Sequence, residues 1–341
     1  MFLPFVLTCL LNAFLARQSH DTVTVAMTGD IMMGTTYPSG QLPSGDGRQL
    51  FVDVASVTAS VDVAAGNLEG TLNEADSCTK HMTAASYAFR TPTVFAPRLK
   101  EAGFDFLSMA NNHAFDFGMS GVRSTMASLD AQGIRYAGLK CQPSSVVLEK
   151  NGVRYGFCAF GHNSYTHRHQ DEEGARRIIA ALADRCDIVV VSFHGGAEGV
   201  AHRHLPWGKE TFYDEDRGSL REFARLCVDA GADIVYGHGP HVIRALELYK
   251  DRIIAYSLGN FCTPYGVNIS GISGYAPVLE VKVNGDGRFV SGKIHSFLQV
   301  RGMGPRADAS ARAAREIKQL TESDVPDTPL HIDDAGNISR K

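Results

Sequence analysis

Apolar and polar positions along this chain alternate in blocks that predict strands followed by helices. Residues 188–193 form a near-continuous apolar run, which is typical of a strand that is covered on both faces of a sheet. Residues 104–107 form a second, shorter strand, and apolar side chains near helical spacing predict a helix over residues 119–131. This repeated succession predicts an α/β fold.

The same reasoning assigns most of the remaining chain. Strands are predicted at 23–27, 61–66, 133–136, 153–160, 233–236, 242–248 and 253–257, and helices at 50–60, 94–102, 172–183 and 220–230. The polar, histidine-rich residues 201–217 are predicted to form a loop over the functional site. We interpret residues 22–303 as the main domain, because no repeat or linker interrupts them.

The last part of the chain is less regular. Residues 275–283 and 289–300 are predicted antiparallel strands joined by a turn at 284–287, and residues 307–320 are a predicted helix. From 321 to 341 the composition is polar and poor in aromatic residues. We therefore predict a C-terminal segment, 304–341, that is helical at first and mobile at its end.

Residues 1–16 are almost wholly apolar, and the first positive side chain is Arg17. This run is too short for a standard membrane span but suits the core of a signal peptide. We therefore expect an exported protein of the periplasm or the membrane-associated cell envelope, with an uncleaved membrane anchor as the alternative. In an exported protein Cys78 and Cys141, which lie in polar loops, could form a disulfide, whereas Cys158, Cys186 and Cys227 lie in apolar segments and are predicted to be buried.

Composition excludes one class of partner. A net charge of −4 and a pI near 6.3 give no basic footprint for nucleic acid.

Residues that can bind a metal follow several of the predicted strands. They are Asp30, Glu69, Asn112, His194, His238 and His241. Each could instead cap a helix or fill a structural role, but loops at the carboxyl ends of strands are where α/β proteins place their chemistry. Carboxylate, amide and imidazole ligands together suit one or two divalent Zn, Mn or Fe ions.

A chemical role follows for several neighbouring residues. Two ions could share Glu69, and His113, next to Asn112, would be placed to protonate a leaving group. The planar guanidinium of Arg90 could recognise an anion. The predicted substrate-binding residues are Arg90, Asn111, Glu198 and Asn260.

Six motifs along the chain together resemble the CapA family of poly-γ-glutamate capsule proteins. They are GDIMMG at 29–34, NLEG at 67–70, ANNHAFDFG at 110–118, the His194 strand end with Glu198, GHGPH at 237–241 and SLGNF at 257–261. The resemblance implies a branch of the calcineurin-like metallophosphoesterases and a four-layer α/β/β/α sandwich of that type. It also implies a role in capsule biosynthesis.

Carried over by position, the resemblance implies metal-binding roles for the six residues that follow the strands. It places His113 in an Asn-His pair. The chain departs from the phosphoesterase pattern at Met32, where those enzymes have a histidine, and a thioether is a poor ligand for hard or borderline ions. His162 or Glu198 are the candidates to complete that metal position.

Three functions fit these observations. The first is an exported metal-dependent hydrolase that acts on a phosphoester or on the γ-glutamyl amide of a cell-envelope polymer. The second is a non-catalytic component that binds or exports a polyanionic polymer alongside membrane-bound capsule synthesis proteins. The third is a relic of the fold with structural histidines. Retention of both the predicted ligand set and His113 argues against the third function.

Overall fold

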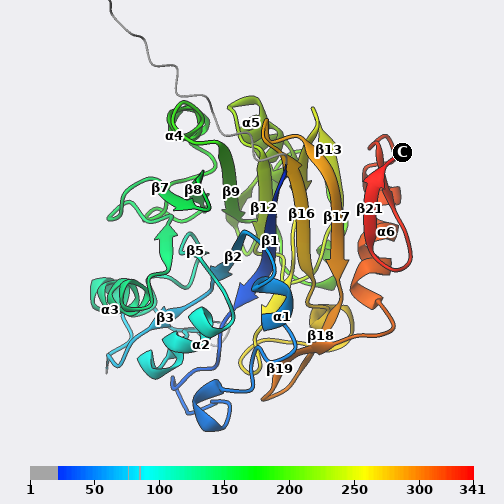
Figure 1. The fold of residues 1–341 in the computed structure, drawn as a ribbon. Helices are drawn as coiled ribbons and strands as arrows, with labels where there is room; N and C mark the ends of the chain where they lie inside the picture. Colours follow the sequence, from blue (N-terminus) through cyan, green and yellow to red (C-terminus); the bar gives the residue numbers. More distant parts are fainter. Residues whose placement is uncertain (1–21, 76, 84–85) are drawn as a thin grey trace, which may run out of the picture.

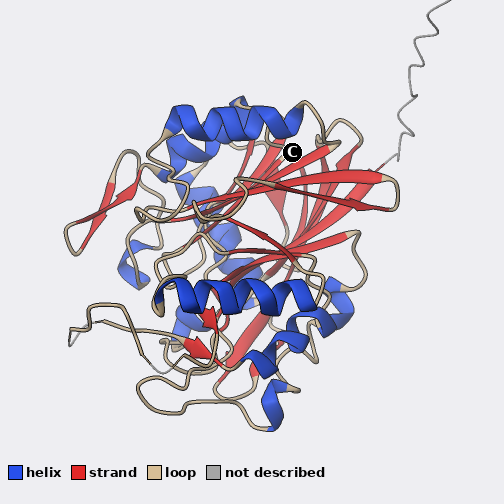
Figure 2. Cartoon of the chain, turned by 90° about the vertical axis from the view of Figure 1, so that its left-hand side faces the viewer, coloured by secondary structure: helices blue, strands red, loops and turns tan. Residues whose placement is uncertain are grey.

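Two β-sheets form the centre of the structure and pack face to face (Figure 1). The computed structural model describes residues 22–341 except 76 and 84–85. Within this part of the chain, helices lie on the two outer faces of the paired sheets, as Figure 2 shows. The four-layer α/β/β/α arrangement implied by the resemblance is confirmed.

The first sheet contains nine strands among the described residues, in the order β20-β21-β17-β16-β1-β2-β5-β6, with β15 also paired to β1. Their bounds are β1 Thr22–Ile31, β2 Val63–Leu68, β5 Phe106–Ser108, β6 Arg135–Ala137, β15 Asn260–Cys262, β16 Val278–Asn284, β17 Phe289–His295, β20 Leu330–Ile332 and β21 Asn337–Arg340. β15, β1, β2, β5 and β6 are parallel to one another, whereas β16, β17, β21 and β20 pair antiparallel.

The second sheet has the order β13-β14-β12-β9-β8-β7. Its strands are β7 Val146–Lys150, β8 Val153–Phe160, β9 Ile188–His194, β12 Ile234–His238, β13 Leu246–Tyr249 and β14 Arg252–Ala255. The four central strands are parallel, and each edge strand is antiparallel to its neighbour. Within the described part of the chain, three further strand pairs lie outside the main sheets: β3 Thr71–Leu72 with β4 Arg90–Thr91, β10 Glu210–Phe212 with β11 Glu215–Gly218, and β18 Phe297–Val300 with β19 Gly304–Ala307.

The helices divide between the two outer faces. On the first sheet lie α1 Ala55–Thr58, α2 Ala96–Glu101 and α3 Gly118–Ala131, and on the second lie α4 Glu172–Ala183 and α5 Leu220–Asp229. The last helix, α6 Arg312–Asp324, packs against β13 and β17 and so covers an edge shared by both sheets. Short 3₁₀ turns occur at η1 Gly45–Gly47, η2 Thr93–Phe95, η3 Val200–His202 and η4 Gly271–Gly274.

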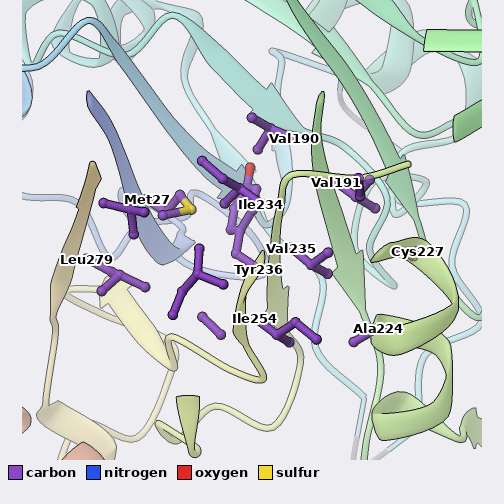
Figure 3. Packing of buried hydrophobic residues seen from close by; sticks show 14 of the residues in the cluster. Met27, Val190, Val191, Ala224, Cys227, Ile234, Val235, Tyr236, Ile254 and Leu279 are labelled. Atoms are coloured by element: carbon purple, nitrogen blue, oxygen red, sulfur yellow. The ribbon is translucent and has the colours of Figure 1, made fainter. Parts of the chain in front are cut away.

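Apolar side chains from both sheets fill the space between them (Figure 3). Met27 and Leu279 of the first sheet lie opposite Ile234 of the second, and all three are fully buried. The rings of Phe106 and Phe157 stack across the same interface with centroids 4.5 Å apart. This packing fixes the two sheets relative to each other, so that groups at their strand ends face one another.

Several sequence predictions require correction. The helix expected at 50–60 is only the short α1, because residues 50–54 form turns. The region 201–217 is not simply a loop, since it contains the β10–β11 pair. Cys78 and Cys141, which could have formed a disulfide, are both free, whereas Cys158, Cys186 and Cys227 are buried as predicted.

The predicted mobile end of the chain is also ordered. Helix α6 continues to Asp324, and β21 then pairs with β17 and β20. Val325, Leu330, Ile332 and Ile338 are buried among mostly polar neighbours, so a few apolar side chains dock this segment on the sheet edge.

Docking of the C-terminal strands gives a testable prediction. Ile338→Ala removes a side chain that is 2% exposed and is expected to lower the free energy of unfolding by about 2–3 kcal/mol. Chemical denaturation measures this change, and the exposed neighbour Ser339→Ala serves as the control. An Ile338→Ala protein with unchanged stability would contradict the docked position.

The predicted signal peptide or anchor, residues 1–16, lies outside the described residues. Among the helices of the described residues, none has the length and apolar character needed to cross a membrane.

Candidate metal centre

The ends of four strands bring together residues that are distant in the sequence. Asp30 is near the end of β1 and Glu69 directly follows β2. His194 and His238 are the last residues of β9 and β12, and they lie side by side in the register of these parallel strands. Because the two sheets face each other, their carboxyl ends converge on one site.

The distances confirm that these side chains meet. The Nδ1 atom of His241 lies 3.3 Å from Asp30 Oδ2, and its Nε2 atom lies 3.6 Å from Glu69 Oε1. Glu69 Oε1 is also 3.6 Å from His194 Nε2, and Asp30 Oδ1 is 3.6 Å from His238 Nδ1. Asp30, Glu69 and His241 each place a potential ligand atom within 4.8 Å of the others.

Many polar atoms of this site are buried without a hydrogen-bond partner. Buried polar atoms are normally paired, because desolvation without a partner is costly. The unpaired atoms are Asp30 Oδ2, both carboxylate oxygens of Glu69, Asn112 Oδ1, and both ring nitrogens of His194 and of His238. This set of oxygen and nitrogen donors fits divalent metal ions.

Burial keeps two of the imidazoles neutral. It lowers the pKa of His194 and that of His238 to about 3 in each case, even though the negative charge of Asp30 opposes the shift. Neutral imidazole is the form that binds a metal. His241 differs: burial lowers its pKa, but the negative charges of Glu69 and Asp30 outweigh burial and raise it to about 10.

The position of His241 depends on its backbone and on Asn260. His241 has a φ of 56°, a left-handed conformation that is uncommon for a side-chain-bearing residue and is often found at functional sites. Asn260 Oδ1 lies 2.9 Å from His241 Nδ1, and its Nδ2 donates to the carbonyl of His241 at 3.1 Å. Asn260 is fully buried and is thus placed to orient His241; its predicted substrate-binding role remains a prediction.

A pair of asparagines supports Asp30. Asn67 Nδ2 donates to Asp30 Oδ1 at 2.8 Å, and Asn111 Nδ2 donates to Asn67 Oδ1 at 3.1 Å. Asn111 Oδ1 also accepts the backbone N–H of His113 at 3.1 Å. Asn111, predicted to contact substrate, is fully buried and joins two loops of the site. Sequence reasoning gave Asn67 no role, although it lies in the NLEG motif.

His113 is held beside the centre by Asp116. The Nδ1 atom of His113 lies 2.8 Å from Asp116 Oδ2, which also accepts the N–H of Phe89 at 2.9 Å. Lys80 Nζ lies 3.0 Å from Asp116 Oδ1. An Nδ1–H donated to Asp116 leaves Nε2 of His113 available for proton transfer. Asp116 was visible in the ANNHAFDFG motif, whereas nothing in the sequence indicated Lys80.

The region 201–217 contributes an ion-pair network to the site. Arg217 Nη1 lies 2.9 Å from Glu198 Oε1, and Arg217 Nε lies 2.9 Å from Glu215 Oε2. Glu210 forms two contacts with the fully buried Arg244, at 2.9 and 2.7 Å. No sequence pattern indicated these arginines, because their partners are separated along the chain and meet only in the fold.

Arg90, predicted to recognise an anion, is used within its own loops. Its Nε donates to Thr36 Oγ1 at 2.7 Å, Nη1 donates to the carbonyl of Ala75, and the guanidinium lies 5.5 Å from the ring centroid of Phe117. These contacts give Arg90 a structural task, and anion binding by Arg90 remains a prediction.

Comparison with known sequences identifies the family. Residues 24–265 match the family described as "Bacterial capsule synthesis protein PGA_cap". The chain belongs to this family. The PGA_cap match contains all the predicted metal ligands and His113, and it confirms the resemblance to capsule biosynthesis proteins.

Two relatives support the PGA_cap assignment. The PGA biosynthesis protein CapA of Bacillus subtilis (strain 168) is 30% identical over 287 residues, covering 80% of this chain and 71% of that protein. The capsule biosynthesis protein CapA of Bacillus anthracis is 30% identical over 270 residues, covering 73% of this chain and 62% of that protein.

Two solved structures are similar to this PGA_cap chain, and the first has a comparable fold. A hypothetical protein from Thermus thermophilus has a TM-score of 0.50 and 16% identity, and the alignment covers 81% of this chain and 99% of that one. A 5′-nucleotidase precursor from the same organism has a TM-score of 0.46 and 13% identity, covering 87% of this chain and 58% of that one. Identities this low describe the fold and assign no activity.

Proposed function

We propose that this chain is an exported, metal-dependent hydrolase of capsule biosynthesis that acts on a phosphoester or on a γ-glutamyl amide of an envelope polymer. The observation that carries the proposal is the set of buried, unpaired donor atoms on Asp30, Glu69, His194 and His238. Apolar or hydrogen-bonded side chains at these strand ends could fill a purely structural role without the desolvation penalty that buried, unpaired polar atoms carry. Family membership supports the link to capsule biosynthesis.

The residues that would hold the metal lie around the carboxylates of Asp30 and Glu69. His241 and His194 each place Nε2 3.6 Å from Glu69 Oε1, and Nδ1 of His241 lies 3.3 Å from Asp30 Oδ2. Bound divalent ions would supply positive charge that activates water and stabilises a developing negative charge.

His113 has the geometry of a general acid. Asp116 accepts its Nδ1–H, which fixes the orientation of the ring and directs Nε2 away from Asp116. A proton on Nε2 can then pass to the departing oxygen or nitrogen of the substrate. The ring of Phe89 packs against His113, with its centroid 4.3 Å from that of the imidazole.

Export rests on the apolar residues 1–16 followed by Arg17. Partners that fit this location are a polyanionic or other cell-envelope polymer and membrane-bound capsule synthesis proteins.

Elemental analysis of the purified full chain tests the metal centre. We expect near-stoichiometric Zn, Mn or Fe in the wild type and its loss in the Asp30→Ala/His238→Ala double variant, because each substitution removes a ligand. The matched control is Asp327→Ala/His331→Ala, an exposed carboxylate and imidazole pair that should leave the metal content unchanged.

Absence of metal from the wild type, even after incubation with each ion, would reject the hydrolase. The polymer-binding component would then be the better account, and the relatives' names, which refer to biosynthesis, are compatible with it.

A further inference from the structure

We propose that a strip of alternating aromatic and basic side chains along α5 binds an acidic polymer, a chain of carboxylates joined by short apolar segments. The strip consists of Trp207, Arg225, Tyr249 and Lys250, with Arg221 packed against the indole. These five residues are called the Trp207 strip. The inference rests on the proposed function, whose polymer it takes as the ligand, but the strip lies outside the metal centre.

Consecutive contacts between rings and cations join the Trp207 strip. The guanidinium of Arg225 lies 5.1 Å from the ring centroid of Trp207 and 5.0 Å from that of Tyr249. The Nζ atom of Lys250 lies 5.2 Å from the same tyrosine centroid. All three distances are within the range of about 6 Å over which a cation and an aromatic ring attract each other. Residues from a loop, from α5 and from the turn between β13 and β14 therefore form one continuous surface.

Trp207 is exposed although its loop is firmly held. The residue is 63% exposed, while the guanidinium of Arg221 lies 4.4 Å from its ring centroid. Nη2 of Arg221 donates to the carbonyl of Leu205 at 3.1 Å, and the N–H of Gly208 donates to Glu222 Oε1 at 2.8 Å. An aromatic side chain on a loop fixed in this way loses little conformational freedom when it binds a ligand.

The basic groups of the Trp207 strip are more exposed than the carboxylates that pair with them. The side chain of Arg225 is 29% exposed, whereas that of its partner Glu247 is 5% exposed. The side chain of Lys250 is 63% exposed, compared with 34% for its partner Asp229. In the described part of the chain, the hydrogen bonds of Arg221 go to two backbone carbonyls. The strip therefore presents positive charge to solvent on a protein whose net charge is −4.

An acidic polymer fits this alternation of groups. Its carboxylates can pair with the guanidinium of Arg225 and the ammonium group of Lys250. Its apolar segments can lie on the rings of Trp207 and Tyr249. A purely apolar ligand would desolvate the two cations without pairing them, and a small anion would leave the exposed indole unused.

The Trp207 strip begins near the metal centre and leads away from it. Arg221 lies in the first turn of α5, shortly after β11, and Arg217 of β11 pairs with Glu198 in the ion-pair network of the site. Lys250 lies in the turn before β14, which is parallel to β12, so it is at the end of the second sheet away from His238. A polymer bound along α5 can therefore reach the metal centre with one end while the strip holds the rest.

Trp207 is the only tryptophan of the chain, so its fluorescence reports on this surface alone. Quenching of Trp207 by acrylamide in the purified full chain, with and without poly-γ-glutamate, tests the proposal. We expect the polymer to protect Trp207, and to do so less as the salt concentration rises. The Asp30→Ala/His238→Ala variant should show the same protection, so failure of the metal centre and failure of the strip are distinguishable.

Variants of the strip are compared through the fluorescence anisotropy of labelled poly-γ-glutamate. We expect at least about fivefold weaker binding for Trp207→Ala and about two- to fivefold weaker binding for Lys250→Gln. One control is Tyr213→Ala, because Tyr213 is also an exposed aromatic residue but is followed by the acidic residues 214–216. The other is Lys100→Gln, an exposed lysine on α2 over the first sheet. Both controls should bind the polymer as the wild type does.

Unchanged quenching of Trp207 at a polymer concentration that saturates the anisotropy signal would overturn the proposal, because the polymer would then bind elsewhere. Wild-type affinity in both Trp207→Ala and Lys250→Gln would also overturn it. Polyphosphate lacks apolar segments for the rings, so equal protection by polyphosphate would reject an acidic polymer of the proposed chemistry. A thermal unfolding scan shows whether each variant is folded, and if Trp207→Ala does not fold, the quenching of the wild type still decides.

Discussion

His113→Asn is expected to lower turnover by about 10²–10⁴-fold while the bound metal is retained. His113 contacts Asp116 through Nδ1, and no atom of His113 is needed to complete the ligand set around Glu69. We therefore expect the substitution to slow proton transfer to the leaving group and to leave metal binding unchanged. The measurement is the rate of hydrolysis of chromogenic phosphodiester and γ-glutamyl anilide substrates, with metal content determined on the same preparation.

The control for this experiment is His331→Asn, an exposed histidine on β20 that should leave turnover unchanged. If the wild type hydrolyses a substrate and His113→Asn is equally fast, His113 is not the general acid. If His113→Asn also loses its metal, the residue acts through the structure of the centre.

Arg244→Leu is expected to destabilise the folded protein by about 3–5 kcal/mol. Arg244 is fully buried and makes two contacts with Glu210, and it also donates to the carbonyl of His202 at 3.0 and 2.7 Å. Its loss would leave the Glu210 carboxylate buried without a counter-charge. Denaturant unfolding monitored by fluorescence or circular dichroism measures the change.

Two further variants test whether loss of the Arg244–Glu210 ion pair causes the destabilisation. Arg244→Leu/Glu210→Gln should regain part of the lost stability, because the neutral amide can still accept the N–H of Ala197 without leaving a buried charge. Arg154→Leu removes a half-exposed ion pair with Asp187 and should change stability little. If Arg244→Leu unfolds at the same denaturant concentration as the wild type, the buried ion pair does not stabilise the protein as predicted.

The strands of the fold were predictable because their apolar patterns are local. β9 is buried along its whole length, and α4 occupies the predicted residues 172–183. Asp171 caps that helix by accepting the N–H of Gly174 at 3.0 Å, and two glutamates follow in its first turn, so its start is also a local feature. The division of the strands into two packed sheets was implied only by the family resemblance, since alternation alone indicates only an α/β fold, and the order of the strands was not predicted.

The end of the chain shows where composition misleads. Residues 321–341 are polar on average, yet Leu330, Ile332 and Ile338 are buried on the sheet edge. A segment with so few apolar side chains docks only where a sheet edge offers an unpaired strand. Here that strand is β17, which lies about 40 residues earlier in the sequence.

The sequence by itself determined which residue types follow each strand: Asp30, Glu69, His194 and His238 could be named from local apolar runs and the polar residues after them. Only the tertiary structure decided how these groups meet, that His241 adopts a left-handed backbone, and that Glu198 faces it from a loop fixed by Arg217 and Glu210. The physical reason is that apolar periodicity is encoded over a few neighbouring residues. Contacts between side chains far apart in the sequence follow from how the two sheets pack.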